Sequence, residues 1–241
     1  MNLLPNTELD CPIVYEDPDL IVLDKPAGLP SHPVHEGERE TVANFLVAYK
    51  TCFQGLGRDP REAGLVHRLD NETSGLLIAA KNKETYDCLR RDFSQKGIEK
   101  EYRAIVLGHP VPHQKIKWPI GPHPKGKKRM KVFFQAAAAR RASAREAMTA
   151  FEVLKKFPRA SLLKVTIKTG CRHQIRVHLA ALGYPILGDT LYGQKNSDSL
   201  PDPPRLCLHA FKMTFLQPRN KKRITVQAPL PEDLKKILRT L

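Results

Sequence analysis

The sequence of 241 residues lacks the cysteine patterns that indicate a disulfide framework or a zinc site. Its five cysteines are odd in number, widely spaced and without a CxxC pair. No apolar run approaches the roughly 18 residues that a membrane-spanning helix needs, and residues 1–10 lack the charged and then apolar pattern of a secretion signal. We therefore expect a protein of a reducing compartment, the cytoplasm, with no metal site and no membrane attachment.

Acidic residues are missing from one part of the chain. The whole sequence has 40 basic and 25 acidic residues and a net charge of +15. Between residues 115 and 145 there is no acid, and the basic residues there are Lys115, Lys117, Lys125, Lys127, Lys128, Arg129, Lys131, Arg140, Arg141 and Arg145. Such a block is typical of proteins that bind a polyanion. The alternative is a solvated basic loop that only aids solubility.

Short strand and helix patterns are interspersed along the chain without a strict β-α-β rhythm. This order predicts an α+β fold, with a mixed, mainly antiparallel sheet flanked by helices. The predicted strands are 13–15, 20–23, 74–81, 101–107, 149–155, 161–169, 206–216 and 223–227. The predicted helices are 41–50, 82–95, 172–182 and 232–238. In the first helix we expect a buried stripe of Val42, Phe45, Leu46 and Tyr49.

We find no internal repeat and no long linker in the sequence. The expected organisation is an N-terminal extension at residues 1–12, followed by one domain at 13–241. The basic block forms an insertion at about residues 115–145, which we expect to be an irregular hairpin or extension. Nothing suggests a coiled coil or a large spare apolar face, so we expect a monomer.

Residues 66–75 (VHRLDNETSG) place Asp70 between two short strands, at the start of a turn-forming run. Loops on a rigid sheet are where catalytic groups usually lie. The segment alone fits equally well an aspartate that merely caps the turn.

Residues 170–178 (GCRHQIRVH) open a predicted helix with Arg172 and Arg176 four positions apart, which would place both on one face. A cation there would keep a buried carboxylate ionised, because an opposite charge offsets desolvation. Taken alone, the two arginines favour an ordinary amphipathic helix with both side chains exposed.

The segments 66–75, 100–104 (KEYRA) and 170–178, in this order and spacing, resemble the RluA-type pseudouridine synthases, a family that isomerises uridine in RNA. The resemblance covers roughly residues 13–230. Lys25 and Pro26 also match a family segment, which we interpret as mainly structural, and residues 206–210 match one that walls the pocket. The first predicted strand begins near Ile13, so we expect the catalytic domain without the small N-terminal RNA-binding domain that many relatives carry.

The resemblance implies a role for each matching residue. Asp70 is the essential catalytic group, Arg176 pairs with it, and the ring of Tyr102 stacks on a uracil flipped out of the RNA. Arg68 would fill the space that the flipped nucleotide leaves. His173 and Gln174 have only a supporting role. No cofactor is implied, because the reaction involves no redox change.

One position departs from the family pattern. Cys171 stands where relatives commonly carry Arg, and the arginine follows one position later as Arg172. We still expect Arg172 to contact RNA. We expect Lys127, Lys128 and Arg129 in the basic block to supply further phosphate contacts, which position RNA without reading its sequence.

Two other classes of enzyme or site are disfavoured. His67-Arg68-Leu69-Asp70 resembles the His-Arg-Asp loop of protein kinases, but the other kinase motifs are absent. His173 and His178 are five apart, without an HExxH pattern, which makes a metal site improbable. A non-catalytic RNA-binding protein that retains the fold is the more serious alternative. The sequence does not identify the target RNA, which is ribosomal or transfer RNA for relatives of this size.

Overall fold

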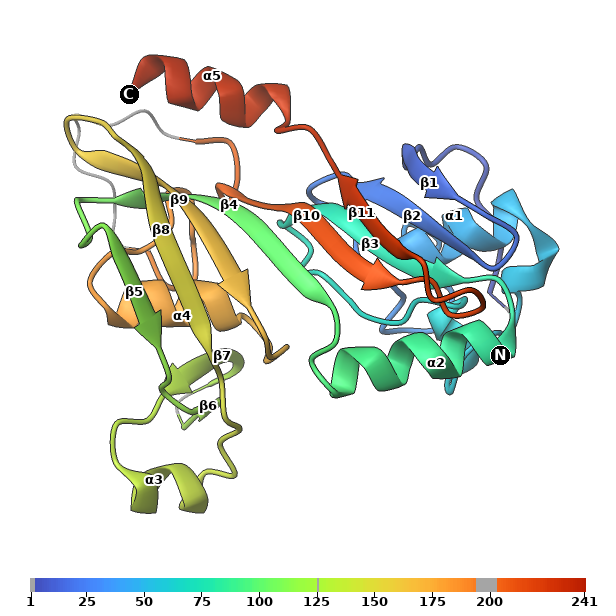
Figure 1. Ribbon diagram of the computed structural model, residues 1–241, viewed down its shortest axis with the longest axis horizontal. Coiled ribbons are helices and arrows are strands. Elements are labelled where there is room, and N and C mark those ends of the chain that lie inside the picture. Colours follow the sequence, from blue (N-terminus) through green and yellow to red (C-terminus); the bar gives the residue numbers. More distant parts are fainter. Residues whose placement is uncertain (1–2, 125, 194–202) are drawn as a thin grey trace. The chain divides into compact units, whose positions relative to one another are not determined.

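The computed structural model describes residues 3–124, 126–193 and 203–241 (Figure 1), without the side chains of Lys127 and Lys128. The chain forms two compact units. The first unit is Met1–Glu99 with Ala210–Ala228, and the second is Lys100–His209 with Pro229–Leu241. The predicted single domain at 13–241 stays a prediction. In the predicted extension at 1–12, the carbonyl of Leu4 accepts from the Asn44 side chain at 2.7 Å.

The first unit contains part of a mixed, mainly antiparallel sheet. Its strands are, in spatial order, β1 (Ile13–Glu16), β2 (Leu20–Lys25), β3 (Ser74–Ala80), β10 (Leu208–Leu216) and β11 (Arg223–Gln227). The predicted hairpin of β1 and β2 is confirmed by their antiparallel register. Every residue of β3 is buried, as its continuous apolar run predicts.

Two helices flank this sheet, α1 (Val42–Tyr49) and α2 (Lys83–Ser94), with the short 3-10 helices η1 (Thr51–Phe53) and η2 (Pro60–Glu62) between them. Asn82 caps α2 as predicted, since its side chain accepts from the Thr85 amide at 2.9 Å. Tyr86 and Leu89 of α2 pack into a core with the apolar residues of β2 and β3.

The predicted buried stripe of α1 is partly wrong. Val42 and Leu46 are buried, but Phe45 is only half-buried and Tyr49 is exposed. The other buried apolar residues are Ala43 and Val47, one position further round the helix. Tyr49 reaches out of the core because its hydroxyl bonds the Glu16 carboxylate at 2.9 Å.

The second unit is built on four strands of antiparallel sheet. In spatial order they are β4 (Glu99–Leu107), β9 (Ala160–Ile167), β8 (Thr149–Lys156) and β5 (His113–Ile116). The helices are α4 (Gln174–Ala181), which contacts β8, and α5 (Glu232–Thr240), whose Asp233 pairs with Arg205 at 2.6 Å.

The basic insertion forms the hairpin β6 (Ile120–His123) and β7 (Gly126–Val132), followed by α3 (Ala136–Arg141). Figure 1 shows these three elements at one end of β5 and β8. The prediction of a hairpin is therefore confirmed. Its apolar residues Ile120 and Val132 pack against Ala147 and against Val177, which belongs to α4.

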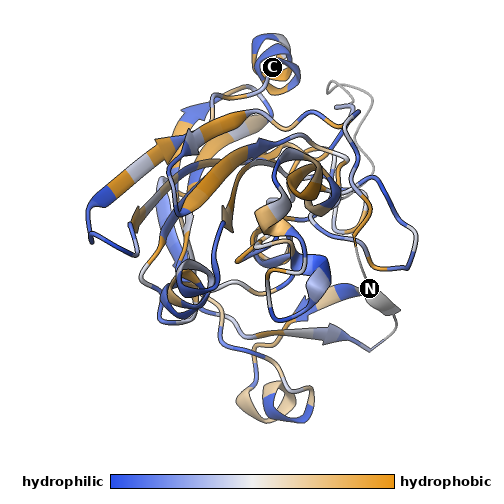
Figure 2. Cartoon of the chain, turned by 90° about the vertical axis from the view of Figure 1, so that its right-hand side faces the viewer, coloured by the Kyte–Doolittle hydropathy of each residue, from blue (hydrophilic) through white to orange (hydrophobic). Residues whose placement is uncertain are grey.

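The α+β class and the mainly antiparallel sheet are thus confirmed. In Figure 2 the hydrophobic residues concentrate in the strands, and the connecting loops are mostly hydrophilic. Among the described residues, no helix is both long and apolar enough to cross a membrane.

Gly75 is the second residue of β3 and lies where no side chain fits. Its φ is +111°, and an added Cβ would lie 2.3 Å from the Ala210 carbonyl oxygen of β10. A glycine is therefore required where the Asp70 turn enters the sheet.

Candidate active site

Asp70 lies in the turn that precedes β3 and is half-buried. The Thr73 amide donates to the Asp70 carbonyl at 3.1 Å, which closes the turn. The preceding residue, Leu69, is held on both sides of its backbone by Ser31. The Ser31 hydroxyl donates to the Leu69 carbonyl at 3.1 Å and accepts from the Leu69 amide at 3.2 Å.

Lys25 anchors the residue on the other side of Asp70. Its ammonium group is fully buried and donates to the carbonyls of Pro26, Leu29 and Asn71 at 2.8, 2.8 and 3.0 Å. The Gly28 amide also donates to the Asn71 carbonyl, at 2.8 Å. Because an ammonium has three donors, this arrangement compensates a buried charge with backbone dipoles. Both chain neighbours of Asp70 are therefore fixed by residues 25–31.

Arg68 lies two residues before Asp70 and is exposed. It is near His32, whose pKa is lowered by burial and further by the positive charge of Arg68. This end of the first unit thus carries positive charge beside the Asp70 turn. The location suits a contact with RNA, as the sequence predicts.

Arg176 lies on α4 in the second unit and is buried. Its Nε and Nη2 donate to the two carboxylate oxygens of Asp189 at 2.9 and 2.8 Å. The Tyr192 ring covers the guanidinium at 5.5 Å, and the Tyr192 hydroxyl accepts from the Met130 amide at 2.7 Å and bonds His173 Nδ1 at 2.8 Å. Arg176 is thus oriented from two sides.

Asp189 is held by more than Arg176. Burial opposes its ionisation, but the hydrogen bond and charge of Arg176, with the amides of Tyr192 and Leu191, keep its pKa below the ordinary 3.8. Its turn follows the segment Pro185–Leu187, which bonds β4 through the Leu107 amide and the Ile105 carbonyl, each at 2.9 Å. The aspartate therefore stays ionised and gives Arg176 a fixed orientation.

The prediction that Arg172 and Arg176 share a helix face is wrong. The helix begins at Gln174, not at Arg172, because His173 takes a left-handed conformation with φ of 56°. Arg172 is consequently exposed before the helix, whereas Arg176 is buried in it. The later start has a clear cause: the Gln174 side chain accepts from Thr169 Oγ1 at 2.8 Å and from the Cys171 amide at 3.1 Å, which ties the loop to the helix start.

Tyr102 lies on β4, opposite Val165 of β9, and is 7% exposed. Lys100 precedes it by two positions and so points to the same face of the strand. Lys100 is 9% exposed, and burial lowers its pKa to about 8. A buried lysine beside the proposed stacking ring was not predicted from the sequence.

Arg129 of the basic insertion is exposed on β7. Lys127 and Lys128 belong to the same strand, but their side chains lie outside the described part of the chain. The Trp118 carbonyl before the hairpin accepts from His178 Nε2 at 2.9 Å, while His178 Nδ1 bonds Thr149 at 2.8 Å. His178 is therefore a core residue that joins α4 to the segment just before β6.

Asp70 belongs to the first unit, and Tyr102 and Arg176 belong to the second. Their convergence therefore remains a prediction. Within each unit, sequence reasoning missed the residues that hold these side chains in place, chiefly Ser31, Asp189 and Tyr192. The sequence does contain a pattern that could have indicated Asp189 and Tyr192. Both lie in a short run between Gly188 and Gly193, which is typical of a constrained turn.

Replacing Lys25 with Met is expected to reduce the free energy of unfolding by about 2–4 kcal/mol, because three backbone carbonyls lose the hydrogen bond from the buried ammonium group. Urea unfolding of Lys25→Met against wild type measures the loss, and the exposed Lys222→Met serves as the matched control. A loss as small as that of Lys222→Met would contradict the anchoring role.

Replacing Asp189 with Asn is expected to destabilise the protein by about 3 kcal/mol near pH 7, because it leaves the buried Arg176 charge without a counter-charge. A carboxyl whose folded pKa is lowered stabilises the fold above its ordinary pKa, and this contribution disappears as the pH falls through the lowered value. The difference from wild type should therefore narrow below about pH 4. Urea unfolding at a series of pH values measures it.

Glu152→Gln, which removes an exposed partner of Lys164 in the same unit, is the control and should cost less than about 1 kcal/mol. A difference for Asp189→Asn that does not change with pH would contradict the ionised state of Asp189.

Comparisons with known proteins point to one family. Residues 19–181 match the family model described as RNA pseudouridylate synthase. The chain is 36% identical over 95% of its length to the ribosomal large subunit pseudouridine synthase D of Nitrosomonas europaea, and it spans 64% of that protein. It is 34% identical over 94% of its length to the protein of the same name from Pseudomonas aeruginosa, of which it spans 70%.

Among solved structures, the human RNA pseudouridylate synthase domain containing 1 superposes with a TM-score of 0.74 at 25% identity, over 97% of this chain and 89% of that one. The family match covers more than half of the chain, and the curated relatives match almost all of it. The chain therefore belongs to the RNA pseudouridylate synthase family, with RluA-type relatives, and the enzymes of this family are isomerases.

Proposed function

We propose that this chain converts uridine to pseudouridine at a specific position in structured RNA, with Asp70 as the essential catalytic group. The observation that carries the proposal is the anchoring of Asp70. It occupies the family's aspartate position, and Ser31 and Lys25 hold the residues on either side of it. Ribosomal and transfer RNA are both candidate substrates, and the names of the relatives from Nitrosomonas and Pseudomonas favour large-subunit ribosomal RNA.

The chemistry requires few groups. The bond between C1′ of the ribose and N1 of uracil breaks, the uracil turns, and a new bond joins C1′ to C5. C5 loses its proton and N1 gains one, so that the atoms balance and no electron is transferred. Asp70 would act by adding to C6, by attacking C1′ or by removing a C2′ proton, and these routes remain open. The reacting base must leave its stack to reach a side chain in a turn.

Arg176 is proposed to pair with Asp70 and to keep it ionised. Its Nε and Nη2 already donate to Asp189. A pair with Asp70 would therefore use the Nη1 side of the same planar group, which has donors on more than one edge. In this proposal Asp189 positions Arg176, and Arg176 positions Asp70. Tyr102 would stack on the uracil from β4.

RNA affinity is proposed to come from positive side chains around the site and in the basic insertion. Arg68 beside the Asp70 turn and Arg172 before α4 are both exposed. Lys127, Lys128 and Arg129 would add contacts to phosphates from β7. Such contacts position the RNA, and they release counterions when they form.

Neutralising Lys127, Lys128 and Arg129 together to Gln is expected to weaken binding of an unmodified RNA transcript. It should also flatten the dependence of log Kd on log salt by about 0.7–0.9 for each phosphate that the variant no longer neutralises. Fluorescence anisotropy at several salt concentrations measures both quantities. An unchanged slope would show that this part of the insertion makes no phosphate contact.

The proposed activity is tested by release of tritium from unmodified RNA that carries ³H at C5 of uridine. Wild-type protein should release tritium, and Asp70→Asn should lower the rate by at least about 10⁴-fold, because the reaction loses its essential group. Binding of the same RNA by both proteins is measured in parallel. Binding without release by the wild type, on ribosomal and transfer RNA alike, would favour the non-catalytic RNA-binding alternative.

A further inference from the structure

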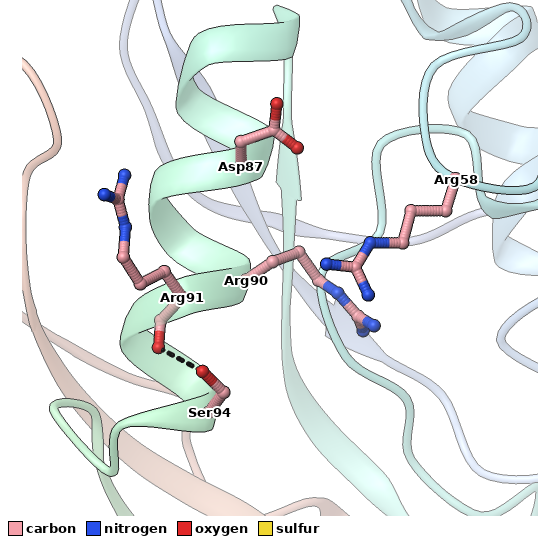
Figure 3. A pocket seen from close by; sticks show the side chains of 5 residues that line it. All are labelled: Arg58, Asp87, Arg90, Arg91 and Ser94. Atoms are coloured by element: carbon pink, nitrogen blue, oxygen red, sulfur yellow. Dashed lines mark hydrogen bonds between the residues drawn. The ribbon is translucent and has the colours of Figure 1, made fainter.

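A pocket on the first unit lies against α2 and is lined by Arg58, Asp87, Arg90, Arg91 and Ser94 (Figure 3). Arg58 belongs to the segment between η1 and η2, and the other four belong to α2. Figure 3 shows the side chains of Arg58 and Arg90 extending toward one another from these two elements. The pocket is outside the basic insertion and outside the segments that resemble the family motifs.

The three arginines of this pocket differ from its carboxylate in their pairing. In the described part of the chain, Arg58, Arg90 and Arg91 take part in no ion pair, whereas the one carboxylate of the lining, Asp87, is bound by Lys83 at 2.6 and 2.7 Å. The lining therefore contains three arginines outside any ion pair and one carboxylate that is already paired.

The pocket is held in shape by contacts behind it. Glu62 accepts from the Arg58 amide at 2.9 Å and also bonds the hydroxyl of Tyr86, a fully buried residue of α2. The segment that carries Arg58 is thereby tied to the helix that carries Arg90 and Arg91. Arg58 and Arg90 consequently extend toward one another although their like charges repel (Figure 3). An anion between them would remove this repulsion.

The chemistry of the lining residues indicates which class of anion the pocket would bind. A guanidinium is planar and donates in parallel pairs, which suits the oxygens of a phosphate. None of the five lining residues has an aromatic ring on which a base would stack. The pocket therefore suits a phosphate that belongs to a nucleic-acid backbone better than it suits a free nucleotide.

One contact links the pocket to the candidate catalytic segment. Arg90 Nη1 donates to the Val66 carbonyl at 3.1 Å, and Val66 opens the segment 66–75 that contains Asp70. A phosphate held here would lie on the helix that contacts the start of this segment, within the same unit. It would hold RNA at a second point, apart from the uridine that reacts.

We propose that the pocket of Arg58, Arg90 and Arg91 binds a backbone phosphate of the RNA substrate. This inference rests on the proposed function in taking RNA as the substrate. It names a binding site on the first unit that is separate from the basic insertion on the second.

The test compares the double variant Arg58→Gln/Arg91→Gln with wild type, using an unmodified RNA hairpin as the probe. Arg90 is left intact because it also bonds Val66. The dependence of Kd on salt should flatten by about 0.7–0.9 in log–log slope for one phosphate contact. Between about 50 and 200 mM salt, wild type should then lose about 3-fold more affinity than the variant does.

Three controls make the result specific. Arg58→Lys/Arg91→Lys keeps the charge and should keep most of the slope. Arg39→Gln removes one exposed arginine that does not line the pocket and should leave the slope unchanged. Thermal unfolding of every variant should match wild type, because the substituted side chains are exposed and outside the core.

An unchanged slope in the Gln double variant would overturn the inference. An equal change in Arg39→Gln would overturn it too, because the effect would then be one of overall charge. Stabilisation by inorganic phosphate that disappears in the double variant, together with an unchanged RNA slope, would identify a site for small anions and equally refute an RNA contact.

The tritium-release assay distinguishes failure of the pocket proposal from failure of the proposed activity. Release by wild type with an unchanged slope would reject the pocket and retain the activity. No release with a flattened slope would retain the pocket and reject the activity.

Discussion

A guanidinium group withdrawn from water must have its charge and its donors matched, and the second unit is organised around one such group. The Arg176 side chain is 3% exposed, and its partner Asp189 is fully buried. The pair is stable only if both groups stay ionised and aligned, because either charge alone in this environment would be costly. Several local features maintain the alignment. Gly188 has a φ of +74°, and a Cβ added to it would lie 2.1 Å from the Arg205 carbonyl oxygen. Glycine at this position therefore lets the chain turn directly into Asp189.

The first unit meets the same requirement in another way. Lys25 is fully buried, and its ammonium group donates to three backbone carbonyls. Carbonyl dipoles help to compensate the buried charge, and the same hydrogen bonds fix the chain next to the Asp70 turn. Each unit thus uses a buried cation to fix a loop. We infer that this rigidity would suit Asp70 to its proposed role as the catalytic group.

The sequence predicted the elements better than the details of the site. Alternating and continuous apolar runs were sufficient to find β1–β4 and β8–β11, because burial of one or both sheet faces leaves a periodic pattern. Helix starts that carry a side-chain cap, such as Asn82 before α2, were also predicted from the sequence. The start of α4 was not, because it depends on the left-handed His173 and on the hydrogen bonds of Gln174, which leave no periodic pattern. This error put Arg172 on a helix face that it does not share with Arg176.

The positions of Asp70, Tyr102 and Arg176 were found through family resemblance, but their partners were not. Ser31 is 38 residues from Leu69, and Asp189 is 13 residues from Arg176. Pairs at such separations depend on how the chain folds back on itself, which composition and spacing do not encode locally. The arginine pocket escaped prediction for the same reason, because Arg58 is brought to α2 through Glu62 and Tyr86. Clustered charge in the sequence pointed only to residues 115–145.

The most direct test of the central claim is position-resolved sequencing of pseudouridine in unmodified large-subunit ribosomal RNA after incubation with the protein. The account predicts new pseudouridine at one or a few defined uridines with wild type and at none with Asp70→Asn. Pseudouridine at the same positions with both proteins would contradict the catalytic role of Asp70. Its absence with both, in transfer RNA as well, would contradict the proposed activity.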